Sequence, residues 1–122
     1  MLASLGAAAC SSPGGHPAVQ VAHDFYAAVE AHDGTHACEL LAPQTRHELE
    51  STAGKPCPRA VLEESLPHAR GRGHLERFGN QAQVDLVGDT VFLSEFRDGW
   101  RIVALMCTPR GAQPYDCQVK GS

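Results

Sequence analysis

Residues 82–108 alternate between hydrophobic and polar side chains in three runs that are separated by two short polar loops. Alternation with a period of two predicts β-strands. Gly88-Asp89 fits a two-residue hairpin loop, Arg97-Asp98-Gly99 fits a three-residue loop, and Gly79-Asn80 predicts a further hairpin upstream. Because hairpins join antiparallel strands, this half of the chain is predicted to form a curved antiparallel meander of about four strands.

Counting outward from these loops assigns the side chains to the two faces of the predicted sheet. One face is aliphatic and is expected to form the core: Leu75, Val84, Leu86, Val91, Leu93, Val103 and Leu105. The other face mixes polar and large apolar side chains, and its interface candidates are Phe92, Phe96, Trp100 and Ile102, with Phe78 and Met106 beside them. A soluble monomer seldom exposes such a patch. Either the two ends of the chain cover this face, or a second copy or a protein partner binds it around Trp100.

The first half of the chain has the spacing of helices. Apolar residues recur at helical intervals over residues 17–32, and Asp33-Gly34 is predicted to end this helix. Thr35 is expected to cap a second helix, and Pro43 and Pro58 are expected to begin two further short helices. Helices segregated from an antiparallel sheet make an α+β fold.

The two ends of the chain are predicted to lie outside these elements. Residues 1–16 are interpreted as an N-terminal tail or the remnant of a signal peptide, and residues 17–122 as a single domain. After Thr108 the chain has too much Pro and Gly for a strand, so it is predicted to be a tail that Cys117 pins back.

Composition and charge exclude several classes of function. The chain has 122 residues, a formal net charge of −4 and no basic run, which argues against nucleic acid as a partner. No stretch has the apolar length that spans a bilayer. No Cys/His pair has the spacing of a structural zinc site, and His32, on the apolar side of the first helix, is expected to be an edge histidine. Neither a metal nor a cofactor is therefore predicted.

Five cysteines indicate the redox environment. Four of them lie within residues 17–122, and an even set suggests two disulfides and an oxidising compartment. The pairs Cys38–Cys57 and Cys107–Cys117 are expected, because each closes a short loop between neighbouring elements. The alternative is four reduced, buried thiols in a cytosolic protein.

Cys10 is the odd cysteine. It follows MLASLGAAA and precedes SSPGG, which resembles the end of a lipoprotein signal peptide followed by a tether, although the hydrophobic stretch is short and no basic segment precedes it. Lipidation of Cys10 would then anchor the protein, and the expected location is extracytoplasmic, either secreted or lipid-anchored at the cell surface. The alternative is a disordered N-terminal tail.

Several motifs together resemble a known family. They are Ala37-Cys38, Leu40 to Pro43, Cys57-Pro58, Gly88 to Leu93, Gly99-Trp100 and Pro114 to Cys117. With the first helix and the final hairpin, they resemble the nuclear-transport-factor-2-like, cystatin-like α+β cone, and more narrowly the small secreted lipoproteins of high-GC Gram-positive bacteria. This superfamily includes ketosteroid isomerases, dehydratases, polyketide cyclases and binding proteins without catalysis, so the resemblance implies a fold and does not select a function.

An enzyme of this superfamily would need an acid or a base inside the cone. His23, Asp24 and Tyr26 lie together on the first predicted helix, and Asp24 as a proton-abstracting base with Tyr26 donating to an oxyanion is chemically feasible. The three cannot all face inward at this spacing, so solvated helix residues are the simpler interpretation. His74 opposite Asp85 is a second pair, which a structural cross-strand contact explains equally well.

Three functions compete at this point. The favoured one is a non-catalytic extracytoplasmic domain that binds a second copy or protein partner on the aromatic face, or a small apolar ligand in the cone. The second is a small enzyme of isomerase or dehydratase type, and the third is a purely structural domain tethered at the cell surface. Whether the cone is hollow, and which polar groups line it, would discriminate between them.

Overall fold

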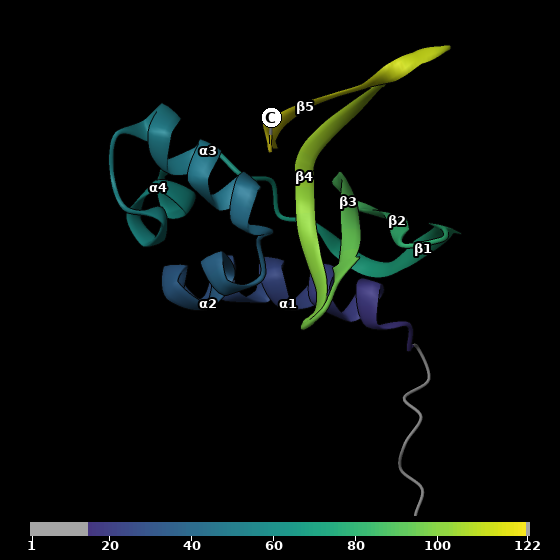
Figure 1. The fold of residues 1–122 in the computed structure, drawn as a ribbon, viewed down its shortest axis with the longest axis horizontal. Coiled ribbons are helices and arrows are strands. Elements are labelled where there is room, and N and C mark those ends of the chain that lie inside the picture. The colour runs from purple at the N-terminus through teal and green to yellow at the C-terminus, as the bar shows by residue number, and fades with distance from the viewer. Residues whose placement is uncertain (1–14, 122) are drawn as a thin grey trace, which may run out of the picture.

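The computed structural model describes residues 15–121, which form four N-terminal helices packed on one five-stranded antiparallel sheet (Figure 1). The helices are α1 (Pro17–Glu30), α2 (Gly34–Glu39), α3 (Pro43–Ala53) and α4 (Cys57–Glu63). The strands are β1 (Arg70–Phe78), β2 (Gln81–Val87), β3 (Asp89–Phe96), β4 (Gly99–Arg110) and β5 (Gln113–Lys120). Their order in the sheet is their order in the chain, so the sheet is a meander and the predicted α+β class is confirmed.

The end of the first helix differs from the prediction in the residue that adopts the left-handed conformation. Pro17 opens α1, and the side chain of His16 caps it by accepting a hydrogen bond from the backbone of Ala18 at 3.0 Å. The left-handed residue after α1 is His32, with a φ of 59°, rather than Gly34. Gly34 serves packing instead, because a Cβ placed there would lie 2.2 Å from the carbonyl oxygen of Pro58 at the start of α4.

Both predicted disulfides are present. Cys38–Cys57 joins α2 to α4, and Cys107–Cys117 joins β4 to β5. Each restricts the unfolded chain and is expected to contribute about 3 kcal/mol to the free energy of unfolding. The pair indicates an oxidising environment. Among residues 15–121, no helix is long and apolar enough to cross a membrane.

The C-terminal tail forms a strand, which corrects the prediction of about four strands. β5 pairs along β4 with Cys107 opposite Cys117 and Thr108 opposite Asp116. The ladder changes register between Thr108 and Arg110, so Pro109 lies where a backbone donor is not needed. Edge position and this irregularity accommodate a proline-rich segment that would not fit a central strand.

The first two hairpins keep the predicted faces. Leu75 lies opposite Val84, as expected from the turn at Gly79-Asn80. The second loop is Val87-Gly88 rather than Gly88-Asp89, so Val84 faces Val91 and not Leu93. This difference moves the pairing by two residues, and because side chains alternate with a period of two, the aliphatic face stays on the core side.

The third hairpin changes the face of the interface candidates. Its loop has two residues, with Phe96 opposite Gly99, so Leu93 faces Ile102 rather than the predicted Val103. A shift of one residue exchanges the two faces of a strand. Trp100 is therefore 5% exposed and Ile102 0% exposed, both in the core, and their predicted position on the outer face is wrong.

An irregularity in β4 limits this exchange to one part of the strand. The register between β3 and β4 changes between Leu93 and Phe92, which leaves Val103 as the extra residue. Beyond it Leu105 is buried as predicted, whereas Val103 is half-buried and borders a surface groove. Phe92 is half-buried and Phe96 is 39% exposed.

Large apolar side chains occupy the space between α1 and the sheet. The largest of those that are less than 2% exposed are Phe25, Leu93, Ile102, Leu105, Val84 and Val91. Their burial supplies the main driving force for folding. The hollows that could hold a ligand lie at the surface of the domain.

Candidate functional site

The edge of β4 is shared by two segments that are distant in the chain. Near its start, Ile102 accepts a backbone hydrogen bond from Ala42 at 2.8 Å and donates one to Leu40 at 2.9 Å. This contact holds the segment between α2 and α3 against β4 as a short parallel bridge. At the next residue of β4, Val103, the segment between α2 and α3 no longer pairs with the strand through its backbone.

The next carbonyl of β4, that of Val103, receives donors from both neighbours. The hydroxyl of Thr45 on α3 donates to it at 2.9 Å, and the backbone N–H of Gly121, just after β5, donates at 3.2 Å. The pairing of β5 with β4 begins with Ala104 opposite Lys120. The first turn of α3 and the end of β5 thus lie on either side of Val103 and leave a groove between them.

We name this the Phe96 groove. It has a volume of about 480 Å³ and is lined by Ala42, Pro43, Gln44, Thr45, Phe96, Val103, Ala104, Lys120 and Gly121. Most of these side chains are apolar, and Lys120 is the one charged residue among the described residues of the lining. The hydroxyl of Thr45 is already committed to the carbonyl of Val103. The groove is therefore suited to an apolar group.

A second hollow lies on the other side of Pro43 and Phe96, which line both. We name it the Arg46 hollow; it has a volume of about 460 Å³ and is lined by Cys38, Glu39, Leu41, Pro43, Arg46, Phe96, Asp98 and Arg101. Arg101 bonds to Asp98 at 3.3 Å and to the carbonyl of Trp100 at 2.8 Å. Arg46 has no ion-pair or hydrogen-bond partner through its side chain among residues 15–121.

The predicted catalytic candidates on α1 border a different hollow, of about 300 Å³, between α1 and the start of β1. Asp24 accepts a hydrogen bond from Gln20 at 2.9 Å at the surface. His23 is half-buried, and its buried Nε2 atom has no hydrogen-bond partner among residues 15–121. Tyr26 is buried in the core, and its hydroxyl bonds to Asp89. The hydroxyl of Tyr26 and the carboxylate of Asp24 therefore do not face a common site.

The hydroxyl of Tyr26 donates to the carboxylate of Asp89, the first residue of β3. The same carboxylate accepts from the backbone N–H of Met106 at 2.9 Å and of Cys107 at 3.1 Å. Met106 has a φ of 56°, which turns these consecutive N–H groups toward the anion. Burial and then the hydrogen bond to Asp89 hold the pKa of Tyr26 far above its ordinary value of 10.0. A hydroxyl held in this way is not available to an oxyanion of a substrate.

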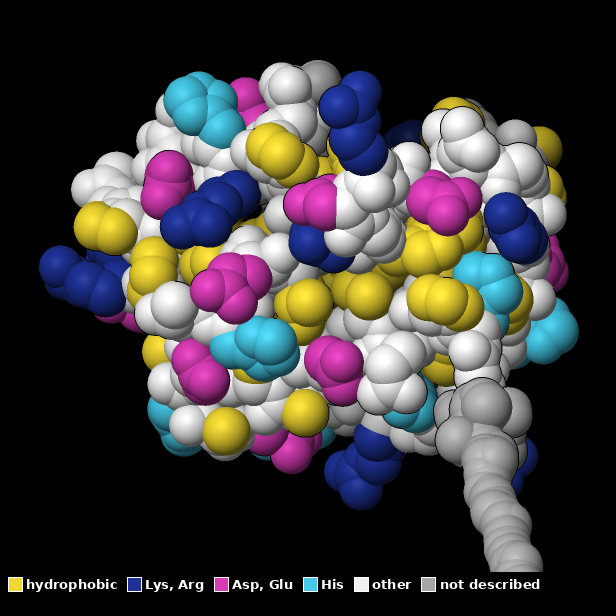
Figure 2. Space-filling view, turned by 60° about the horizontal axis from the view of Figure 1, so that its bottom comes forward, with side chains coloured by type: hydrophobic (Ala, Val, Ile, Leu, Met, Phe, Trp, Pro, Cys, Tyr) yellow, Lys and Arg dark blue, Asp and Glu magenta, His cyan; other side chains and the backbone are white. Residues whose placement is uncertain are grey.

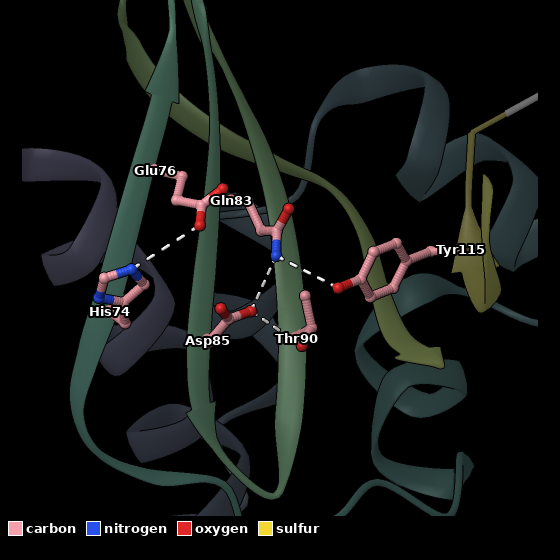
Figure 3. A network of polar contacts seen from close by, with 6 residues as sticks. All are labelled: His74, Glu76, Gln83, Asp85, Thr90 and Tyr115. Carbon is pink, nitrogen blue, oxygen red and sulfur yellow. Dashed lines mark hydrogen bonds and ion pairs between the residues drawn. The ribbon is translucent and has the colours of Figure 1, made fainter. Parts of the chain in front are cut away.

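The face of the sheet opposite the helices carries a polar network (Figure 3). Asp85 accepts hydrogen bonds through one oxygen from Gln83 and from Thr90, each at 3.0 Å. The amide of Gln83 on β2 also lies 3.5 Å from the hydroxyl of Tyr115 on β5. Tyr115 packs edge-on against Phe92 with 5.2 Å between ring centroids. The curled C-terminal strand thus covers part of the outer face near Phe92.

His74 lies opposite Asp85 in the register, as predicted. Among the described residues no hydrogen bond joins these two side chains; the Nε2 atom of His74 instead lies 3.8 Å from Glu76 (Figure 3). His32, expected at the apolar side of the first helix, is exposed after the end of α1. Within residues 15–121 no cluster of three or more His, Cys, Asp or Glu could hold a metal ion.

The sequence patterns missed the buried carboxylate and the groove. Asp89 alternates with Val91 and Leu93, so its place on the core face was available as a signal, but the turn interpretation placed it in a loop. The groove has no local signal, because its lining comes from four separate stretches of chain. Cys10, the predicted lipidation site, lies outside the described residues. Comparison with known proteins finds no matching family model, no matching curated protein and no matching solved structure.

Proposed function

We propose that this chain is a non-catalytic, extracytoplasmic binding domain, and that its ligand site is the Phe96 groove. The observation that carries the proposal is an open, mainly apolar groove of about 480 Å³ beside a half-exposed phenylalanine. Small-molecule sites are concave, mostly apolar and roughly 300–1,000 Å³ in volume. The groove lies outside the sheet and replaces the cone interior as the proposed position of an apolar ligand.

The wider identity of the domain belongs to the same proposal. The order of four helices followed by a five-stranded meander, together with the cysteine motifs, supports membership of the nuclear-transport-factor-2-like cone superfamily. A secreted lipoprotein of the type found in high-GC Gram-positive bacteria, lipidated at Cys10, fits the two disulfides. Binding is favoured over isomerase or dehydratase chemistry, because Tyr26 is engaged by Asp89 and Asp24 lies at the surface.

A neutral fluorescent apolar probe, N-phenyl-1-naphthylamine, tests the groove directly. Ala104 lines the groove, so Ala104→Trp should fill it and abolish the rise in probe fluorescence that the parent produces. Ala112→Trp, in the exposed turn before β5, is the matched control and should bind like the parent. Circular dichroism and thermal melting establish that both variants are folded. Equal probe binding by the folded Ala104→Trp variant and the parent would refute the groove as the site.

A contact with a second copy or a protein partner is the second candidate function, and exposed aromatic side chains favour it. Phe78 is 61% exposed and Phe96 39% exposed. They lie at the same end of the sheet, since the turn residue Asn80 accepts a backbone hydrogen bond from Glu95 at 2.8 Å. With Trp100 buried, such a contact would be centred on Phe78 rather than on the tryptophan.

A further inference from the structure

We infer that the ligand of the Phe96 groove is an anionic amphiphile, whose apolar chain lies in the groove and whose anionic head group is recognised by Arg46 and Lys120. This inference rests on the proposed binding function and adds the chemical class of the ligand. Its basis is the juxtaposition of an apolar groove with two cations that lack ion-pair partners within the described part of the chain.

The two hollows form one continuous candidate surface, because Pro43 and Phe96 line both. Among residues 15–121, their charged lining consists of three cations and two anions: Arg46, Arg101 and Lys120, with Glu39 and Asp98. The whole chain carries a formal net charge of −4, so this region is positive against a negative background. A cationic or neutral ligand would have no such complementarity here.

Pairing within the lining leaves Arg46 and Lys120 as the available cations. Asp98 is held by Arg101 at 3.3 Å, whereas Glu39 lies 3.5 Å from His36, which is charged only when protonated, so the carboxylate of Glu39 remains an anion in the lining of the Arg46 hollow. Arg46 and Lys120 are exposed; Arg46 lines the Arg46 hollow, Lys120 lines the Phe96 groove, and Pro43 and Phe96 line both. An arginine guanidinium binds a carboxylate through two parallel hydrogen bonds, and a lysine ammonium acts as a point charge.

On the face of the molecule where the described chain begins, side chains of both charges are mixed (Figure 2). Figure 2 shows Lys and Arg side chains interspersed there with Asp, Glu and His, and hydrophobic side chains between them. No patch of one sign extends across that face, so long-range attraction is weak. Recognition of an anion then depends on local contacts that combine a cation with apolar surface.

Three ligands of equal chain length distinguish the contribution of the head group to affinity from that of the apolar chain. Octanoate, octanol and octylammonium at pH 7 are measured by their displacement of N-phenyl-1-naphthylamine from the parent protein. We expect octanoate to bind several-fold more tightly than octanol, and octylammonium to bind most weakly. The advantage of octanoate over octanol should decrease as salt rises, because exposed charges are screened.

Charge-removing variants identify the recognising residues. Arg46→Gln and Lys120→Gln should each lower octanoate affinity by about two- to fivefold, the range expected of an exposed ion pair. The double variant should bind octanoate and octanol with equal affinity. Arg72→Gln, an exposed arginine on β1 outside both hollows, is the matched control and should keep the preference.

Each outcome is decisive. Equal affinities of the parent for the three ligands, or a preference that survives the double substitution, would overturn the inference while leaving a groove for neutral ligands. Failure of the probe and of all three ligands to bind the parent would refute the proposed function together with the inference. Binding of octanoate that Ala104→Trp leaves intact would place the anion site elsewhere and would also overturn it.

Discussion

Replacing Tyr26 by phenylalanine should destabilise the domain through Asp89. Asp89 is 8% exposed, and its carboxylate accepts three hydrogen bonds, one of them from the Tyr26 hydroxyl. Tyr26→Phe removes that donor and leaves the ring, so no large cavity forms. Losing a hydrogen bond to a buried charged group costs about 1.5–3 kcal/mol of the free energy of unfolding. Urea unfolding at pH 7 should show a lower midpoint with an unchanged m-value.

The pH dependence gives an independent check with a definite sign. Burial and the hydrogen bond to Asp89 raise the pKa of Tyr26 above its ordinary value of 10.0. Below pH 10 the tyrosine is protonated in both states, and its contribution to stability is fully present. Above pH 10 the unfolded chain releases the proton and the native state keeps it, so this group lowers the stability of the parent by up to about 1.4 kcal/mol per pH unit. Tyr26→Phe lacks this loss, so the two stabilities should converge as pH rises above 10.

The other tyrosine of the chain is the control. Tyr115 is half-buried, and its hydroxyl lies 3.5 Å from the amide of Gln83. Tyr115→Phe should change the stability by less than about 0.5 kcal/mol, as surface substitutions usually do. If Tyr26→Phe matched this control at pH 7, or if its stability remained parallel to that of the parent above pH 10, the assignment of Asp89 as a stabilising buried carboxylate would be wrong.

Two further predictions test the core and the outer face. Leu93 is 1% exposed, so Leu93→Ala should lower the free energy of unfolding in urea by about 2–5 kcal/mol. Val87→Ala, at an exposed turn, is the control and should have little effect. An unfolding midpoint of Leu93→Ala equal to that of the parent would contradict the core assignment. If a second copy binds the end of the sheet that carries Phe78 and Phe96, sedimentation velocity should show association as the protein concentration rises. Phe78→Asp should weaken this association without unfolding the protein. A parent protein that stays monomeric at every concentration would exclude this self-association.

Local patterns predicted much of the fold because the interactions behind them are close in sequence. The turn at Gly79-Asn80 and the alternation around it placed Leu75 opposite Val84. Period-two alternation placed Val84, Val91 and Leu93 on the core face even though the second loop was misplaced, since a shift of two residues preserves the face. Short spacing between neighbouring elements predicted both disulfide pairs.

Local patterns were therefore sufficient to predict the α+β class, the meander, the core face of β2 and β3, and the cysteine pairing. Tertiary structure decided the one-residue register of the last predicted hairpin, which buries Trp100 and Ile102, and the extra residue at Val103. It also decided that the proline-rich tail becomes an edge strand and that Asp89 is bound from α1 and β4. The Phe96 groove belongs to this second group, because its walls come from stretches of chain that meet only where they compete for the edge of β4. Strand register and edge pairing depend on packing interactions between residues that are distant in the sequence, and a local sequence pattern does not contain that information.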